Sequence, residues 1–128
     1  MFAPMIDHTG ITVTDFKRSL AFYEKALAPL GYTAIMTLES WAGFGEGKKP
    51  DFWIGIGEAP PKDRVHIAFA AKGREMVRAF YEAAIAAGGK DNGPPGVRKE
   101  YHPNYYGAFI LDPDGHNIEA VCHEPYLD

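Results

Sequence analysis

The chain repeats itself with an offset of 58 residues. Residues 21–27 (Ala-Phe-Tyr-Glu-Lys-Ala-Leu) align with residues 79–85 (Ala-Phe-Tyr-Glu-Ala-Ala-Ile), with five identities in seven positions. The same offset aligns His8 with His66, and each histidine precedes its repeated segment by 13 residues. Helix-forming composition alone does not explain a histidine that keeps this distance. The repeat therefore predicts two copies of one structural unit, each with an imidazole at an equivalent place.

Each unit is predicted to contain one strand, one helix and three further strands. The first segment alternates apolar and polar residues, which is typical of a half-buried strand. An amphipathic segment that ends at glycine follows, as expected of a helix. In the first unit, strands are expected at 6–14, 32–38, 41–46 and 51–57, with the helix after a cap at Thr14 or Asp15. In the second unit, strands are expected at 64–70, 98–102, 105–112 and 117–123, with the helix at 74–87.

This order favours an α+β fold in a single domain, with one module at about residues 1–60 and a second at about 61–128. One helix per unit covers the apolar face of its strands, so the other face stays free. The alternation of each first strand places His8 and His66 on that free face. Two such sheets side by side are expected to form a curved, barrel-like mixed sheet around a central cleft, with both histidines pointing into it.

Composition argues against several classes of partner. A formal charge of −4, with acidic and basic residues interspersed, argues against nucleic acid and anionic membranes. No segment approaches the roughly 20 apolar residues that span a bilayer. The first residues lack the basic and apolar regions of a signal peptide, and the one cysteine, Cys122, cannot form an internal disulfide. We therefore expect a cytoplasmic protein.

Glu119 is a candidate metal ligand because of the strand face on which it lies. The apolar residues of 117–122 occupy one face of that strand, so Glu119 lies on the other, together with the two histidines. A carboxylate among apolar residues is costly without a partner, and a cation offsets that cost. Two imidazoles and one carboxylate suit a divalent ion such as Fe, Zn, Ni, Mn or Co. His8, His66 and Glu119 are the predicted ligands; the alternative is a pocket that keeps these residues and binds no metal.

The equivalent strand of the first unit, at 51–57, offers no such carboxylate on its free face. It places Trp53 there with two glycines, and space beside an aromatic wall suits an organic ligand. Phe44 is a second candidate for this wall, although core packing is the favoured alternative for it. Arg98 is a candidate for binding an acidic substrate, although surface charge is the commoner role of an arginine.

The segment Tyr-His-Pro-Asn-Tyr-Tyr is a candidate source of proton donors. If it closes over the pocket, His102, Tyr105 and Tyr106 are able to donate to a substrate oxygen. Packing of amphipathic side chains at the rim is an equally good alternative. Of the other histidines, His116 is expected in an exposed turn, and His123, near the chain end, is not assigned to the site.

Four segments of the chain combine these features: residues 7–13 (Asp-His-Thr-Gly-Ile-Thr-Val), 21–23 (Ala-Phe-Tyr), 65–69 (Val-His-Ile-Ala-Phe) and 112–119 (Asp-Pro-Asp-Gly-His-Asn-Ile-Glu). Together they resemble the vicinal oxygen chelate superfamily. That superfamily includes glyoxalase I, type I extradiol dioxygenases, fosfomycin-resistance enzymes, methylmalonyl-CoA epimerase and bleomycin-resistance proteins. The resemblance extends over nearly the whole chain and is specific for the superfamily, not for one reaction.

The resemblance implies metal ligands at His8, His66 and Glu119, with Glu119 also able to act as a base. Glyoxalase I has a further carboxylate on the fourth strand, which this chain lacks, and this argues against isomerisation of a glutathione hemithioacetal. We expect a small metal-dependent enzyme that chelates vicinal oxygens of a small organic substrate, either a lyase or isomerase or an extradiol-type dioxygenase. The alternative is a metal-free protein that binds a small molecule or drug, like the bleomycin-resistance proteins. Members commonly form dimers, so a homodimer is expected.

Overall fold

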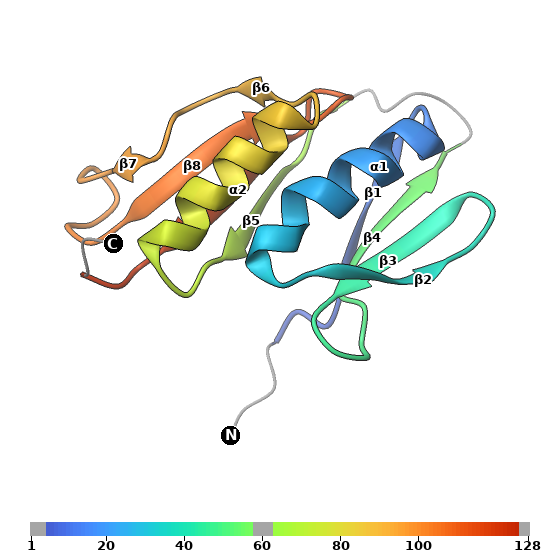
Figure 1. Ribbon diagram of the computed structural model, residues 1–128, viewed down its shortest axis with the longest axis horizontal. Helices are drawn as coiled ribbons and strands as arrows, with labels where there is room; N and C mark the ends of the chain where they lie inside the picture. The colour runs from blue at the N-terminus through green and yellow to red at the C-terminus, as the bar shows by residue number, and fades with distance from the viewer. Residues whose placement is uncertain (1–4, 58–62, 126–128) are drawn as a thin grey trace.

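The structure is a computed structural model, and it describes residues 5–57 and 63–125. The first unit has the expected β-α-β-β-β order, and in the second unit two short strands follow the helix before the last two strands (Figure 1). The first unit contains β1 (Thr9–Val13), α1 (Phe16–Leu27), the short 3₁₀ helix η1 (Ala28–Leu30), β2 (Thr33–Thr37), β3 (Trp41–Gly45) and β4 (Phe52–Ile56). The second contains β5 (His66–Ala70), α2 (Arg74–Ala86), the short strands β6 (Lys90–Asp91) and β7 (Gly96–Val97), then β8 (Tyr106–Leu111) and β9 (Asn117–Cys122).

The two sheets have the same topology. The first has the order β1-β4-β3-β2 and the second β5-β9-β8-β6, with β7 also paired to β8. In each, the first strand runs parallel to the last, and the register pairs Gly10 with Trp53 and Ala68 with Glu119. Because Gly10 and Ala68 are related by the 58-residue offset, Trp53 occupies in the first unit the place that Glu119 has in the second. The α+β class is confirmed, as two curved sheets that do not close into one barrel.

The two helices lie side by side on one side of the sheets and leave the other side open (Figure 1). Helix α1 begins after Asp15, whose carboxylate accepts the backbone N–H of Arg18 at 3.1 Å and so caps the helix. The core lies between the helices and the sheets. Its largest fully buried side chains include Tyr23, Phe52 and Phe80. Neither helix in the described residues has the length and apolar character needed to cross a membrane.

The turn between β8 and β9 joins the two units through two polar contacts, one buried and one exposed. Tyr23 on α1 donates its hydroxyl to the Asp112 carboxylate at 2.5 Å, and both residues are buried. Thr14, just before α1, donates its hydroxyl to Asp114 at 2.5 Å. The first residues of the segment 112–119, which is one of the four segments that carry the family resemblance, therefore connect the two units.

His116 in this turn is buried, with 1% of its surface exposed, so the expectation of an exposed residue is wrong. Its Nδ1 accepts the backbone N–H of Val65 at 3.1 Å, and its Nε2 donates to the carbonyl of Thr12 at 3.0 Å. Both ring nitrogens thus have partners from different strands, and these offset the cost of burying the imidazole.

The strand expected at 98–102 is also absent, since residues 99–101 form a turn. The backbone N–H of Arg98 donates to the Tyr105 carbonyl at 2.7 Å, and that of Tyr101 donates back to Arg98 at 3.1 Å. The strand contacts lie at β6 and β7 instead, on either side of the Gly-Pro-Pro-Gly segment. Two consecutive prolines remove backbone donors, which keeps these pairings short.

Candidate functional site

The open face of the second sheet carries a buried carboxylate with two partners. Glu119 on β9 is only 1% exposed, although no helix covers this face. One of its oxygens, Oε1, lies 2.7 Å from His66 Nε2 on β5, and the other accepts the hydroxyl of Tyr105. Strand alternation explains the placement, because the neighbours Ile118 and Ala120 point into the core. The structure thus brings His66 and Glu119 together, with Tyr105 beside them.

Tyr105 is positioned as a hydrogen-bond donor to Glu119. Burial, then the hydrogen bond to Glu119 and its negative charge, raises the pKa of the Tyr105 phenol well above its usual value. The phenol therefore stays protonated at neutral pH. Its ring packs against His102 and His123 with centroid distances of 5.5 and 5.3 Å. The two imidazoles are themselves joined, with His102 Nε2 at 2.6 Å from His123 Nδ1. His102 thus contacts the Tyr105 ring, and Tyr105 in turn donates to Glu119.

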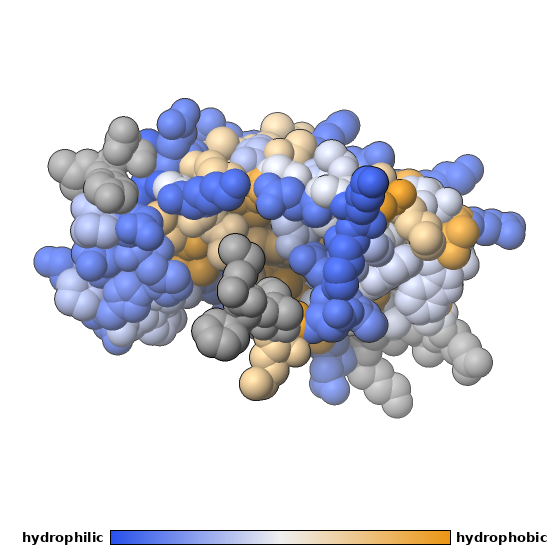
Figure 2. Space-filling model, turned by 90° about the horizontal axis from the view of Figure 1, so that it is seen from below, coloured by the Kyte–Doolittle hydropathy of each residue, from blue (hydrophilic) through white to orange (hydrophobic). Residues whose placement is uncertain are grey.

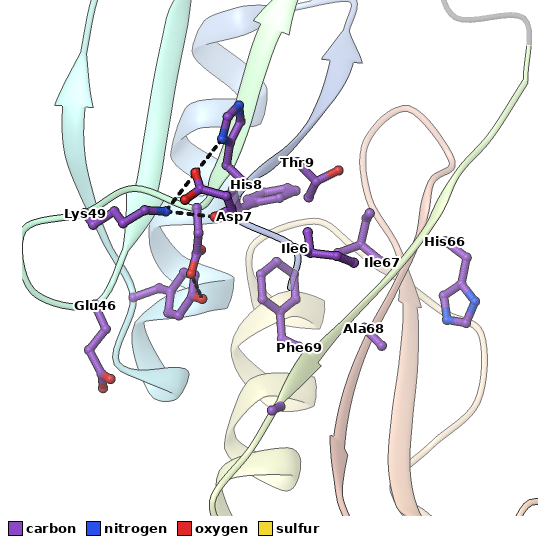
Figure 3. A pocket seen from close by; sticks show the side chains of 14 residues that line it. Ile6, Asp7, His8, Thr9, Glu46, Lys49, His66, Ile67, Ala68 and Phe69 are labelled. Atoms are coloured by element: carbon purple, nitrogen blue, oxygen red, sulfur yellow. Dashed lines mark hydrogen bonds and ion pairs between the residues drawn. The ribbon is translucent and has the colours of Figure 1, made fainter. Parts of the chain in front are cut away.

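His8 lines a cavity of about 800 Å³ between β1 and β5, and His66 lines the same cavity (Figure 3). Its Nδ1 is 2.8 Å from the Asp7 carboxylate, which also accepts Lys49 Nζ at 3.2 Å. The hydrogen bonds from His8 and Lys49, together with the charge of Lys49, lower the pKa of Asp7. Apolar surface gathers in a hollow in the middle of this side of the molecule, between two polar flanks (Figure 2).

The three candidate metal ligands do not come together in the part of the chain that the structure describes. In residues 5–57 and 63–125, no three His, Cys, Asp or Glu side chains lie close enough together to hold a metal ion. His66 is at the edge of the cavity, and its ring and that of His8 point away from each other (Figure 3). The expectation that His8, His66 and Glu119 meet at one point within the chain is therefore not met. A single chain supplies two adjacent donors, His66 and Glu119.

Two further candidates lie away from these donors. Phe44 is fully buried in the core, which is the role that the sequence analysis favoured for it, and it does not line the cavity. Tyr106 is on the helix side of β8, where its ring lies under the Arg74 guanidinium at 4.9 Å and its hydroxyl accepts from Arg78 at 3.4 Å. Tyr105 and Tyr106 are adjacent in sequence, and strand alternation sends them to opposite faces. The proposed proton-shuttle role of Tyr106 therefore has no support from its position.

Trp53 lies on the open face of the first sheet, as the sequence indicated, and Arg98 lies against Phe109 of the second sheet. The Trp53 ring rests on Gly43, where an added Cβ would be 2.9 Å from it. The Arg98 guanidinium lies over the ring of Phe109 at 5.4 Å. Sequence reasoning did not identify Phe109, and it set His123 aside because of its position near the chain end. Strand alternation was the available signal for both residues. Phe109 is the cross-strand partner of Glu119, and His123 follows Glu119 by four residues, so alternation puts both on the face of Glu119.

A comparison against family models agrees with this fold. The model of the Glyoxalase/Bleomycin resistance protein/Dioxygenase superfamily matches residues 5–120. The chain therefore belongs to this superfamily, which confirms the resemblance inferred from its sequence. The comparison with curated proteins gives no match.

Solved structures of the same superfamily share the fold. A glyoxalase/bleomycin resistance protein from Albidiferax ferrireducens is 28% identical, with a TM-score of 0.80 over 94% of this chain and 100% of that one. A family enzyme from Burkholderia phytofirmans is 20% identical, with a TM-score of 0.72 over 93% and 98%. A lactoylglutathione lyase from Agrobacterium tumefaciens is 18% identical, with a TM-score of 0.68 over 94% and 95%. At these last two identities the likeness concerns the fold alone.

Proposed function

We propose that this protein is a metal-dependent enzyme acting on vicinal oxygens of a small organic substrate, as a lyase or isomerase or as an extradiol-type dioxygenase. The observation that carries the proposal is the buried Glu119 carboxylate beside the exposed His66 imidazole, on a sheet face that no helix covers. We assign these two groups and His8 as ligands of one divalent ion, whether Fe, Zn, Ni, Mn or Co. Such an ion would supply Lewis-acid polarisation of the substrate oxygens.

The separation of His8 from the other two ligands leads us to propose that a second copy of the chain completes the site. His8 and the His66–Glu119 pair lie on different sheets, and β1 and β5 each pair on one side only among the described strands. Exposed apolar side chains on and beside the first sheet, including Met36, Trp41 and Ile56, favour association. In a homodimer, His8 of one chain would face His66 and Glu119 of the other.

The chain's own residues supply the proton chemistry in this proposal. Tyr105 donates its hydroxyl to Glu119, and we assign it as the donor to a substrate oxygen. Glu119, once released from the phenol, is the base. His102 and His123 hold the Tyr105 ring in place. The cytoplasm remains the proposed location and a small molecule the proposed ligand.

Elemental analysis tests the metal assignment. Protein prepared without chelators, and without oxygen to protect a ferrous ion, is expected to contain roughly one divalent ion per chain. Protein that contains no ion and takes up none of Fe, Zn, Ni, Mn or Co on dialysis would contradict the enzyme proposal. A fluorescence titration with small aromatic compounds, before and after chelator treatment, is the companion measurement. Unchanged ligand binding in chelator, by protein that also holds no ion before chelator treatment, supports the second candidate.

The second candidate is a metal-free protein that binds an aromatic small molecule. It is favoured by two tryptophan rings that lie on glycine backbone on the open face of the first sheet. An added Cβ would lie 2.3 Å from the Trp41 ring at Gly55 and 2.9 Å from the Trp53 ring at Gly43. Glycine therefore lets both rings lie flat, with Trp41 46% exposed. Flat, exposed indole rings offer a stacking surface to an aromatic ligand.

A further inference from the structure

Arg98 is held in a cradle formed by the loop between β6 and β7 and by strand β8. Its guanidinium lies over the Phe109 ring at 5.4 Å, and Nη2 donates to the Pro94 carbonyl at 2.6 Å. Two glycines make room for it: an added Cβ would lie 2.9 Å from Nη1 at Gly96 and 3.2 Å from Nη2 at Gly93. The backbone and the aromatic ring thus fix the position of the positive charge.

Phe109 connects this cradle to the His66–Glu119 pair. It is the cross-strand partner of Glu119, and its ring centroid is 6.2 Å from that of His66. Side chains directly opposite each other on neighbouring strands share one face of the sheet. The open face of the second sheet therefore carries a row of four groups: the Arg98 guanidinium, the Phe109 ring, the His66 imidazole and the Glu119 carboxylate.

The charge of Arg98 is available to an anion. In the described part of the chain, no carboxylate lies within ion-pair distance of it. Among the described residues, only Pro94 takes one of its five side-chain N–H groups. A planar guanidinium with free N–H groups matches the two oxygens of a carboxylate.

We propose that Arg98 binds the carboxylate of the substrate, and that the substrates are small organic carboxylates with a flat apolar or aromatic body. The body would lie along Phe109, between the carboxylate at Arg98 and the reacting oxygens at His66 and Glu119. The proposal rests on the proposed function for the place of the reacting oxygens. The anion-binding subsite itself does not depend on a metal ion.

Two matched probes test this subsite in the whole protein after chelator treatment. The probes are 2-hydroxybenzoate and 2-hydroxybenzamide, which share a ring with an ortho hydroxyl group and differ in charge. Calorimetric titration is expected to show about tenfold tighter binding of the benzoate by the unaltered protein. Arg98→Met should lose this preference, and Arg98→Lys should keep part of it. Lys99→Met, which removes an exposed charge from the next residue, should leave the preference intact.

Gly96→Ala provides a second variant that keeps the charge and displaces it, because its Cβ would lie 2.9 Å from Arg98 Nη1. It too should weaken the preference for the benzoate. Equal affinity of the unaltered protein for both probes, no binding of the benzoate at millimolar concentration, or an intact preference in Arg98→Met would each overturn the proposal. Metal content is measured separately: a charge preference without metal refutes only the metalloenzyme, and metal without a charge preference refutes only this subsite.

Discussion

Replacing Glu119 with alanine is expected to lower the affinity for the divalent ion by at least about a hundredfold, since loss of a residue that merely supports a ligand already costs about ten- to a hundredfold. The Glu119 carboxylate supplies negative charge that offsets the charge of the cation. Without it, His66 is the one donor of the pair that remains. The affinity is measured by equilibrium dialysis with Zn²⁺ and Mn²⁺. Circular dichroism of the metal-free protein checks that the variant folds.

Glu124→Ala is the matched control, because Glu124 is an exposed carboxylate shortly after the same strand. It should bind the ion as the unaltered protein does. His66→Ala should resemble Glu119→Ala, with a smaller loss expected because imidazole carries no compensating negative charge. If Glu119→Ala binds the ion with unchanged affinity, the carboxylate is not a ligand and the metal assignment fails.

Asp112→Ala is expected to lower the free energy of unfolding by about 3–5 kcal/mol, because each buried donor left without an acceptor costs about 1–3 kcal/mol. The Asp112 carboxylate accepts the hydroxyl of Tyr23 and the backbone N–H groups of Asp114 and His116. Tyr23 and His116 are almost fully buried, so water does not replace the lost acceptor. Urea denaturation followed by tryptophan fluorescence measures the change.

Two milder variants separate the hydrogen bonds from the rest of the turn. Asp112→Asn keeps one carbonyl oxygen and should cost less than alanine. Tyr23→Phe removes only the hydroxyl that donates to Asp112, and should lower the free energy of unfolding by about 1–2 kcal/mol. A change of under about 0.5 kcal/mol in Asp112→Ala, the range of ordinary surface substitutions, would show that this turn does not hold the two units together.

The internal architecture of each unit could be predicted from the repeat and the strand alternation. The 58-residue offset aligns His8 with His66, and the register confirms it by placing Trp53 where the second unit has Glu119. Alternation in 117–122 put Glu119 on the open face, where the structure has it. These features are local, because they depend on strand periodicity and on which side chains are apolar.

The arrangement of the two units could not be predicted, because it depends on contacts without a periodic signal. His116 joins β1 to the second sheet through its ring nitrogens, and nothing in a turn sequence indicates that its histidine is buried. In the resulting arrangement the His8 ring points away from the His66 ring (Figure 3). His8 therefore does not join the His66–Glu119 pair in the described part of one chain, although the sequence analysis expected all three to meet there. The cradle of Arg98 was equally hidden, since it depends on how a Gly-Pro-Pro-Gly loop folds back over Phe109.

The central claim is that His8 of one chain and the His66–Glu119 pair of another hold one ion. Its most direct test is the metal content of purified mixed dimers that combine a His8→Ala chain with a Glu119→Ala chain. Each variant alone should lack the ion at both shared sites. In the mixed dimer one site regains all three ligands, so about half of the wild-type content should return. Mixed dimers that form and hold no ion, or a His8→Ala protein with full metal content, would contradict the claim.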